Sequence, residues 1–172
     1  MNDRPVNEQW APLLVWALAA MFVGCSTAAT FEGMVPTSFE TVNAHPQTVH
    51  VRVSGGQESV ALGRPQITNA AFTQALVASI TKSRMFAKVI ENTTPSADYL
   101  LIVTLFSMEK LVFGQSVSLE AGWTLQRADT GAIVWRESIT SQSTHSDIQQ
   151  ATEAVARINI GQALAKISKL NL

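Results

Sequence analysis

The stretch that decides the fold is residues 119–139, which read LEAGWTLQRADTGAIVWRESI. Its first half alternates apolar and polar side chains, and this period of two predicts a strand with one buried face. The central RADTG supplies Asp129 and Gly131, two residue types that suit a reversal of the backbone. The second half, AIVWRESI, returns as another strand. The sequence therefore predicts an antiparallel β-hairpin over this stretch.

Upstream of the hairpin, residues 97–113 read ADYLLIVTLFSMEKLVF and predict the longest strand of the chain. From Tyr99 to Phe106 both faces of this strand are apolar, which indicates that it is covered on both sides or contacts a partner on one of them. Two helices cover only one face of a small sheet, so the other face needs a different cover. We expect the apolar segment around residues 31–39 to cover part of it, and the rest to self-associate or bind a partner.

Two amphipathic helices flank the strands in the sequence. Apolar and small side chains recur at spacings of three and four after Asn69, which is expected to cap a helix that ends near Met85. Asp147 is expected to cap a final helix that runs to about Lys169. A first strand, QTVHVRVSG (residues 47–55), precedes both helices. The sequence thus predicts an α+β, two-layer sandwich in the order β-α-β-β-β-α, with a mixed sheet, an antiparallel hairpin and two helices packed on one face.

Near the start of the chain, residues 13–23 form an eleven-residue apolar run, LLVWALAAMFV. A membrane-spanning helix needs about 20 apolar residues, whereas a secretory signal needs about 7–15. The run is followed by Gly24 and by Cys25, the only cysteine, and this arrangement resembles the lipobox of bacterial lipoproteins. The resemblance implies cleavage before Cys25, a thioether between its thiol and diacylglycerol, and acylation of the new N-terminal amine, with palmitate among the acyl chains. The alternative is an uncleaved N-terminal anchor with an incidental cysteine.

These features divide the chain into three parts. Residues 1–24 are predicted to be a lipoprotein signal peptide, residues 25–46 the lipidated N-terminus and a tether, and residues 47–172 a periplasmic α+β domain. In enteric lipoproteins an aspartate after the cysteine retains the protein at the inner membrane. Ser26 stands there, so the resemblance implies a lipid anchor in the outer membrane, facing the periplasm.

Charge and cysteine content exclude several classes of function. The formal net charge is −1, and without residues 1–24 the acidic and basic side chains are equal in number. A neutral chain gives no electrostatic basis for binding nucleic acid, and we expect no such partner. A single cysteine excludes an internal disulfide and a multi-cysteine metal site.

The search for catalytic residues returns only weak candidates. The segment STHSD (residues 143–147) brings a serine, a histidine and an aspartate together, but a catalytic triad is assembled by tertiary geometry and not by neighbours in sequence. His45, His50 and His145 show no metal-ligand spacing, and the glycines of residues 55–65 lack a phosphate-binding pattern. The sequence therefore predicts no enzyme, no metal and no cofactor.

The remaining candidates are apolar residues that could contact a partner. One face of the long strand and the two hairpin tryptophans make up this candidate interaction surface: Tyr99, Leu101, Val103, Leu105, Trp123 and Trp135. The alternate face carries Leu100, Ile102 and Phe106. For both tryptophans, packing in the core is the default interpretation, because a large aromatic ring buries much apolar area, and a lipid- or peptide-binding platform is the alternative.

The helix AFTQALVASITKSRMFAKVI, the strand ADYLLIVTL, the hairpin and the terminal helix together resemble a group of small, mostly uncharacterised proteobacterial lipoproteins. The plan over residues 47–170 is similar to the YajG-like lipoproteins, to LptE and to the N-terminal domain of TolB, and also to the auxiliary lipoproteins of ABC-type lipid transporters. The resemblance implies an accessory or scaffold protein of envelope assembly or transport that acts through protein contacts. A lipid-binding or lipid-transport module is one alternative. An enzyme is another, because some sequences of this type carry an acyltransferase label.

Overall fold

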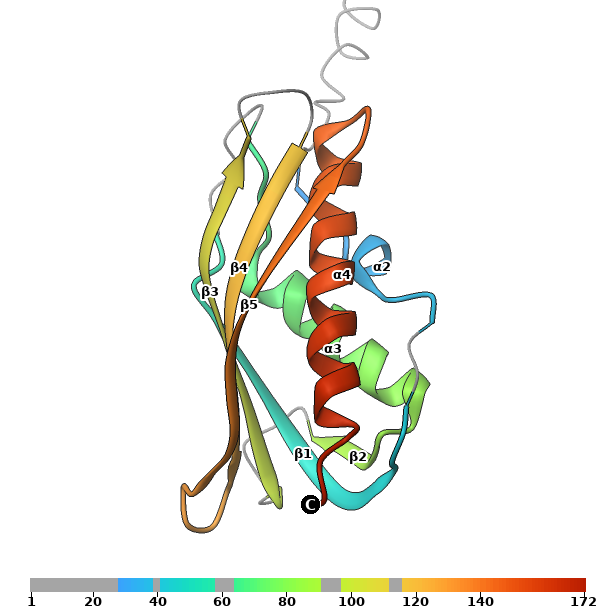
Figure 1. Cartoon of the computed structure of the whole chain (residues 1–172), viewed down its shortest axis with the longest axis vertical. Helices are drawn as coiled ribbons and strands as arrows, with labels where there is room; N and C mark the ends of the chain where they lie inside the picture. Colours follow the sequence, from blue (N-terminus) through green and yellow to red (C-terminus); the bar gives the residue numbers. More distant parts are fainter. Residues whose placement is uncertain (1–27, 39–40, 58–63, 91–96, 112–115) are drawn as a thin grey trace, which may run out of the picture.

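Five strands form one mixed sheet in the order β2-β1-β3-β4-β5 in the computed structural model, which describes residues 28–38, 41–57, 64–90, 97–111 and 116–172 (Figure 1). The strands are β1 (His45–Ser54), β2 (Phe86–Ile90), β3 (Tyr99–Lys110), β4 (Ser116–Arg127) and β5 (Ile133–Thr144). β1 pairs in parallel with both β2 and β3, whereas β3, β4 and β5 are antiparallel. The sheet is therefore mixed, as predicted.

The helices lie on one face of this sheet (Figure 1). They are α2 (Phe31–Met34), α3 (Asn69–Ser83) and α4 (Ile148–Ile167). α3 packs on β1 and β2, α4 packs on β4 and β5, and the short α2 lies against α3 and α4. This arrangement confirms the predicted α+β class with two helices on one face. The opposite face of the sheet carries no helix of the described part of the chain.

The structure adds a strand that the sequence pattern did not reveal. Residues 86–90, FAKVI, form β2 at the sheet edge and pair with β1. The strand is only five residues long, so its alternation is too brief to distinguish it from the end of the preceding helix. Arg84 has a left-handed φ of 53°, which ends α3 and turns the chain back toward the sheet.

The hairpin forms as predicted, with β4 and β5 joined by residues 128–132. Gly131 has a φ of 70°, a left-handed conformation that glycine adopts without steric cost. The Asp129 carboxylate accepts a hydrogen bond of 2.8 Å from the Thr130 amide, and the Gly131 amide donates to the Arg127 carbonyl at 2.9 Å. The turn is therefore closed by its own backbone and by one aspartate.

Of the two predicted helix caps, one is confirmed and the other is shifted by one residue. Asp147 caps α4, accepting hydrogen bonds from the Gln149 and Gln150 amides, as the sequence indicated. At α3 the cap is Thr68, whose hydroxyl accepts from the Ala71 amide at 3.0 Å. Asn69 is the first residue of the helix, and its side-chain oxygen accepts from the Gly56 amide at 2.8 Å. The prediction that Asn69 is the cap is wrong by one residue, because either residue type can cap a helix.

The core lies between the sheet and the helices. Its largest fully buried side chains include Trp123, Phe72 and Ile160, contributed by β4, α3 and α4. Each large apolar side chain buried in this way stabilises the fold by about 1.5–3 kcal/mol relative to exposure. The core is therefore shared by elements that are far apart in the sequence.

Part of the predicted tether belongs to this folded unit. Met34 is fully buried, and α2 rests on the outer side of the helix layer. The Glu153 carboxylate of α4 accepts hydrogen bonds from the Thr30 amide at 3.0 Å and the Thr30 hydroxyl at 2.9 Å. Arg157 donates to the Gly33 carbonyl from Nε at 2.9 Å. The folded unit therefore includes residues 28–38, ahead of the domain boundary predicted at residue 47.

Candidate functional site: the uncovered face of the sheet

The predicted interaction surface is mostly buried within the chain. Five of its six residues, namely Tyr99, Leu101, Val103, Leu105 and Trp123, have exposed fractions of 7% or less. They point toward α3 and α4, so the helices already cover them and they cannot form an interaction surface. Trp135 alone keeps part of its surface, and it packs at the margin of the core. The sequence prediction therefore chose the wrong face of β3.

Among the described residues no helix covers the opposite face of the sheet, and we call it the open face. On β3 it carries Leu100 and Ile102, which are partly buried, and Phe106, which is 58% exposed. Ile133 of β5, 50% exposed, lies on the same face, because it pairs with Gln126, which in turn pairs with Leu100. Exposed phenylalanine on a sheet face is uncommon in a monomer and marks contact sites when it belongs to a patch.

The segment expected to cover this face does not reach it. Residues 28–38 lie on the helix side of the sheet, where α2 contacts α3 and α4 (Figure 1). The expectation that residues 31–39 cover the second face of β3 is therefore wrong for the described part of this segment. Met34 is instead fully buried on the helix side, where α2 packs against α3 and α4.

A groove crosses the middle of the open face. It has a volume of about 360 Å³, and Ile102, Thr104 and Phe106 of β3 line one side of it. The register of β3 with β4 shifts between Leu105 and Ser107, so Phe106 sits in a β-bulge. Its ring lies over Gly122, where a Cβ would come within 2.5 Å of the ring. The bulge and the glycine together leave room for the phenylalanine to lie across the sheet.

The groove has a polar side as well. Arg136 of β5 lies on the open face and donates from Nε to the Thr124 hydroxyl at 3.3 Å. Ser138 donates to the Glu120 carboxylate at 3.0 Å. Apolar side chains on β3 are thus bordered by a polar strip on β4 and β5. This pattern of an apolar centre with a polar rim is typical of surfaces that bind other proteins.

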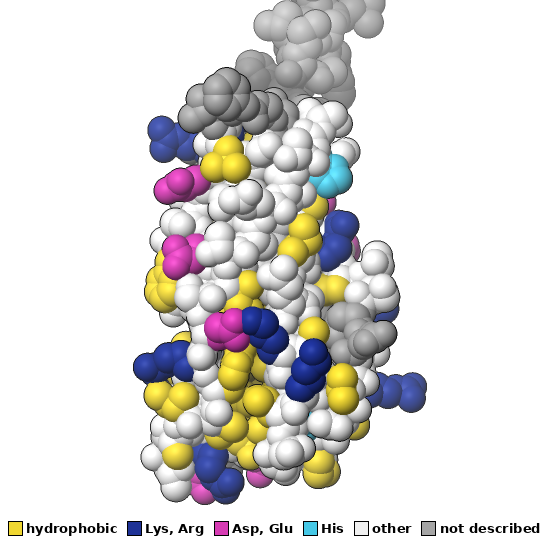
Figure 2. All heavy atoms as spheres, viewed as in Figure 1, with side chains coloured by type: hydrophobic (Ala, Val, Ile, Leu, Met, Phe, Trp, Pro, Cys, Tyr) yellow, Lys and Arg dark blue, Asp and Glu magenta, His cyan; other side chains and the backbone are white. Residues whose placement is uncertain are grey.

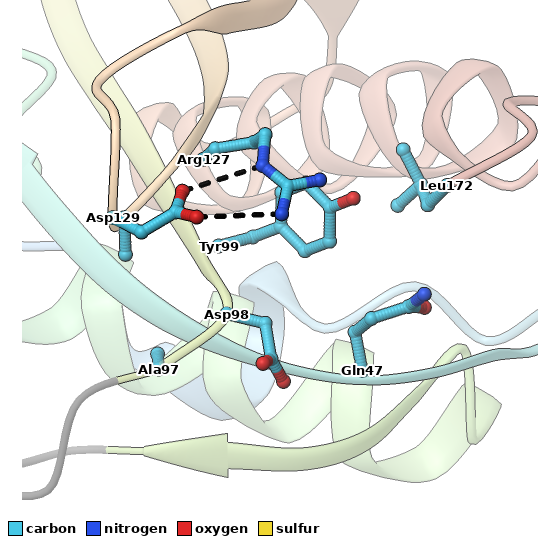
Figure 3. A pocket seen from close by; sticks show the side chains of 8 residues that line it. Gln47, Ala97, Asp98, Tyr99, Arg127, Asp129 and Leu172 are labelled. Carbon is cyan, nitrogen blue, oxygen red and sulfur yellow. Dashed lines mark hydrogen bonds and ion pairs between the residues drawn. The ribbon is translucent and has the colours of Figure 1, made fainter.

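A second, polar pocket of about 340 Å³ lies where β3 begins and β4 ends (Figure 3). The Asp98 carboxylate accepts hydrogen bonds from the Thr48 amide at 2.7 Å and from its hydroxyl at 2.8 Å. These hydrogen bonds from Thr48 lower the pKa of Asp98 below its ordinary value. Asp98 thereby joins the start of β3 to β1.

On the other side of this pocket, Arg127 and Asp129 form an ion pair with Nε and Oδ1 3.3 Å apart (Figure 3). The hydrogen bond from Arg127 lowers the pKa of Asp129, and the same contact raises the pKa of Arg127. Both groups are well exposed, so the pair adds little to stability. Asp98, Arg127 and Asp129 therefore each interact with other residues of the chain, and these contacts hold the strand ends and the turn in place.

The other residues that the sequence offered as catalytic or metal-binding candidates do not form a common site. His45 starts β1 and is buried, with its Nε2 3.2 Å from the Ile167 carbonyl. His145 is exposed, and Asp147 beside it serves as the cap of α4.

In the described residues no group of three or more His, Cys, Asp or Glu could hold a metal ion. None of the helices within those same ranges is long and apolar enough to cross a membrane. Cys25 lies outside the described residues.

The hydrophobic surface also extends to one end of the molecule. Figure 2 shows hydrophobic side chains gathered over the end that carries the β4–β5 turn and the C-terminus, with basic side chains around them. Ile133, directly after the turn, is 50% exposed. A sequence signal for the open face did exist, because Leu100, Ile102 and Phe106 recur at even spacing on β3, although Thr104 interrupts them.

Fold and site together define a two-layer α+β protein in which the helices of the described residues all lie on one side of the sheet. No family model matches the chain, and no curated protein matches its sequence. Among solved structures, a hypothetical protein from Chlamydia trachomatis matches with a TM-score of 0.57 and 11% identity, over 72% of this chain and 96% of that one. A Xanthomonas campestris protein of the family model DUF330 matches with a TM-score of 0.53 and 16% identity, over 82% and 90%.

A PelC dodecamer from Paraburkholderia phytofirmans is also similar, with a TM-score of 0.52, 13% identity and coverage of 78% of this chain and 96% of PelC. At these identities the likeness shows the fold alone. It agrees with the coarser part of the sequence resemblance, to small bacterial proteins of this plan. The similarity to the YajG-like lipoproteins, to LptE and to TolB stays a prediction.

Proposed function

We propose that this chain is a lipid-anchored accessory or scaffold protein on the periplasmic face of the outer membrane, and that it acts in envelope assembly or transport through protein contacts. The observation that carries the proposal is the open face: helices cover one side of the sheet, while the other presents Phe106 and Ile133 to solvent. The lipobox-like sequence around Cys25 supports the anchor. We propose a non-enzymatic role, in keeping with the hydrogen bonds and the ion pair that Asp98, Arg127 and Asp129 of the polar pocket make within the chain (Figure 3).

Two kinds of partner fit the open face. One is another envelope protein. The other is a second copy of this chain, which the fold likeness to PelC supports, because PelC was solved as a dodecamer. A lipid-binding module remains the second candidate function. It is favoured by a cavity lined by Phe31, Val77 and Ile90 on the helix side of the molecule.

Site-specific photo-crosslinking in intact envelopes tests the proposal. A photoreactive amino acid is placed at Ile102 on the open face, and at Gln150, an exposed position of α4, as the matched control. We expect a discrete crosslinked species from position 102 that position 150 does not give. A species at the mass of a dimer identifies self-association, and any other mass identifies a separate partner. Equal, diffuse crosslinking from both positions would argue against an interaction face.

A further inference from the structure

The molecule has an apolar cavity beside the segment that leads to Cys25. The cavity has a volume of about 480 Å³ and lies between α2, α3 and the strands β1 and β2. Val77 and Ala78 of α3 line it together with Phe31 of α2. Val51 and Ile90, both buried, contribute from the sheet. It is separate from the open face, which lies on the other side of the sheet.

The chemistry of the lining selects an apolar ligand. Phe31, Val51, Val77, Ala78 and Ile90 are apolar, and the polar members are Thr73 and the exposed Gln74. None of these described lining residues is charged, so nothing there would pair with a headgroup or another ion. A volume of this size falls within the range of about 300–1,000 Å³ that is usual for small-molecule sites.

The position of the cavity in the chain identifies a source for that ligand. Six peptide units separate Cys25 from Phe31, and a chain spans at most about 3.6 Å per residue, so their Cα atoms are within about 22 Å. Three units separate Cys25 from Ala28, whose neighbour Ala29 is fastened by a hydrogen bond to the Gln66 carbonyl at 3.1 Å. An acyl chain spans about half of the hydrocarbon core of roughly 30 Å, or about 15 Å. An acyl chain on Cys25 therefore reaches the cavity when the six intervening peptide units are less than fully extended.

Anchoring does not require every acyl chain of such a lipid. Two membrane-binding signals hold a protein stably at a bilayer, and a triacylated cysteine carries one chain more than that. Each CH₂ group gains about 0.8 kcal/mol on leaving water, whether it enters a bilayer or an apolar cavity. One chain can therefore occupy the protein while the other two keep it anchored.

We infer that the cavity between α2, α3 and β1 binds one acyl chain of the lipid carried by Cys25. This rests on the proposed acylation of Cys25. The docked chain holds the α3 side of the domain toward the membrane, and the open face stays free for a protein partner.

Metabolic labelling with a palmitate analogue that carries a photoreactive diazirine tests the inference on the full-length protein in its membrane. After irradiation, peptides are mapped by mass spectrometry. We expect a crosslinked pair in which one peptide contains Cys25 and the other contains residues of α3 around Val77. A phospholipid adduct on α3, without the Cys25 peptide, would show that the cavity takes bilayer lipid and would overturn the inference.

Variants provide the matched comparison. Ala78→Trp fills the cavity and should abolish the crosslinked pair, whereas Ala70→Trp, at an exposed alanine of the same helix outside the cavity, should preserve it. Thermal unfolding checks that both variants fold. If the wild type is labelled at Cys25 but no pair forms, the inference fails and the anchor stands. If Cys25 is not labelled at all, the proposed anchor fails. The wild-type adduct decides the question even where Ala78→Trp does not fold.

Discussion

At the scale of single residues, Asn159 connects the helix layer to the sheet. Its side-chain oxygen accepts a hydrogen bond from Trp123 Nε1 at 3.0 Å, and its Nδ2 donates to the Ile139 carbonyl at 2.9 Å. Asn159 is fully buried. Ser141, also buried, lies 3.2 Å from the same Nδ2 and donates to the Val155 carbonyl at 3.0 Å. A polar network of this kind specifies one packing of α4, because every alternative leaves buried polar groups without partners.

The substitution Asn159→Ala should lower the free energy of unfolding by about 2–4 kcal/mol, since a buried group left without its partner costs about 1–3 kcal/mol. Denaturant unfolding of residues 26–172 measures the loss. Gln162→Ala, at an exposed position of the same helix, should change the free energy by no more than about 0.5 kcal/mol. Equal effects of the two substitutions would contradict the role of the network.

Trp123 fills the centre of the core and contacts Phe72, with the two ring centroids 6.1 Å apart. Trp123→Ala should therefore destabilise the domain by about 3–5 kcal/mol. Thermal or denaturant unfolding checks this value. A loss of only a few tenths would mean that the ring is not part of the core in solution.

Asp98 should make stability depend on pH. Its folded-state pKa is lowered by the hydrogen bonds from Thr48, so its contribution is fully present above the unfolded pKa and is lost as pH falls through the folded pKa. The difference in unfolding free energy between the wild type and Asp98→Asn should be constant near neutral pH and shrink below the ordinary aspartate value of 3.8. Urea unfolding between neutral and strongly acidic pH measures it. A difference that grows on acidification would have the wrong sign.

At the scale of elements, the short α2 is held by α4 through several contacts. One of these contacts is the Glu153 carboxylate. Burial raises the pKa of Glu153, but hydrogen bonds from Gln149 and Thr30 outweigh burial and lower this pKa overall. Met34 adds apolar contact beneath these polar ones. The segment that leads from the anchor is therefore part of the domain and not a free linker.

Met34→Ala should lower the unfolding free energy by about 2–5 kcal/mol, because the side chain is fully buried and its removal leaves a cavity. Val42→Ala is the matched control, since Val42 is 58% exposed in the same N-terminal part of the chain. Denaturant unfolding of residues 26–172 with each substitution gives the comparison. A negligible effect of Met34→Ala would mean that α2 is not docked in solution.

At the scale of the whole molecule, the anchor and the domain should be separable. Cys25→Ser should abolish incorporation of a palmitate analogue and release the protein or leave an uncleaved precursor. The released domain should still fold, because its core is built from described residues such as Met34, Phe72 and Trp123, and it should unfold at a lower temperature than the lipidated protein if the acyl chain occupies the cavity. Labelling and membrane fractionation measure the first effect, and thermal unfolding measures the second. Equal label on wild type and variant would contradict the lipoprotein proposal.

The sequence alone determined the features that depend on near neighbours. The hairpin turn follows from Asp129 and Gly131, the cap of α4 from Asp147, and the alternation along β3 and β4 from a period of two. The proposed anchor at Cys25 likewise rests on adjacent residues. Each of these is set by backbone conformation and hydrogen bonds within a few residues, and such preferences can be read from a short window.

Only the tertiary structure decided which face of β3 is covered. Both faces of that strand are apolar, so the local pattern is symmetric and the choice falls to contacts with α3 and α4, which are distant in sequence. Tertiary contacts also decided the formation of β2, because a strand this short is recognisable only by its pairing with β1. They decided the role of Asn159 too, since its partners Trp123 and Ile139 come from other elements. The open face, and with it the proposed contact site, exists because long-range packing selected one of two locally equivalent surfaces.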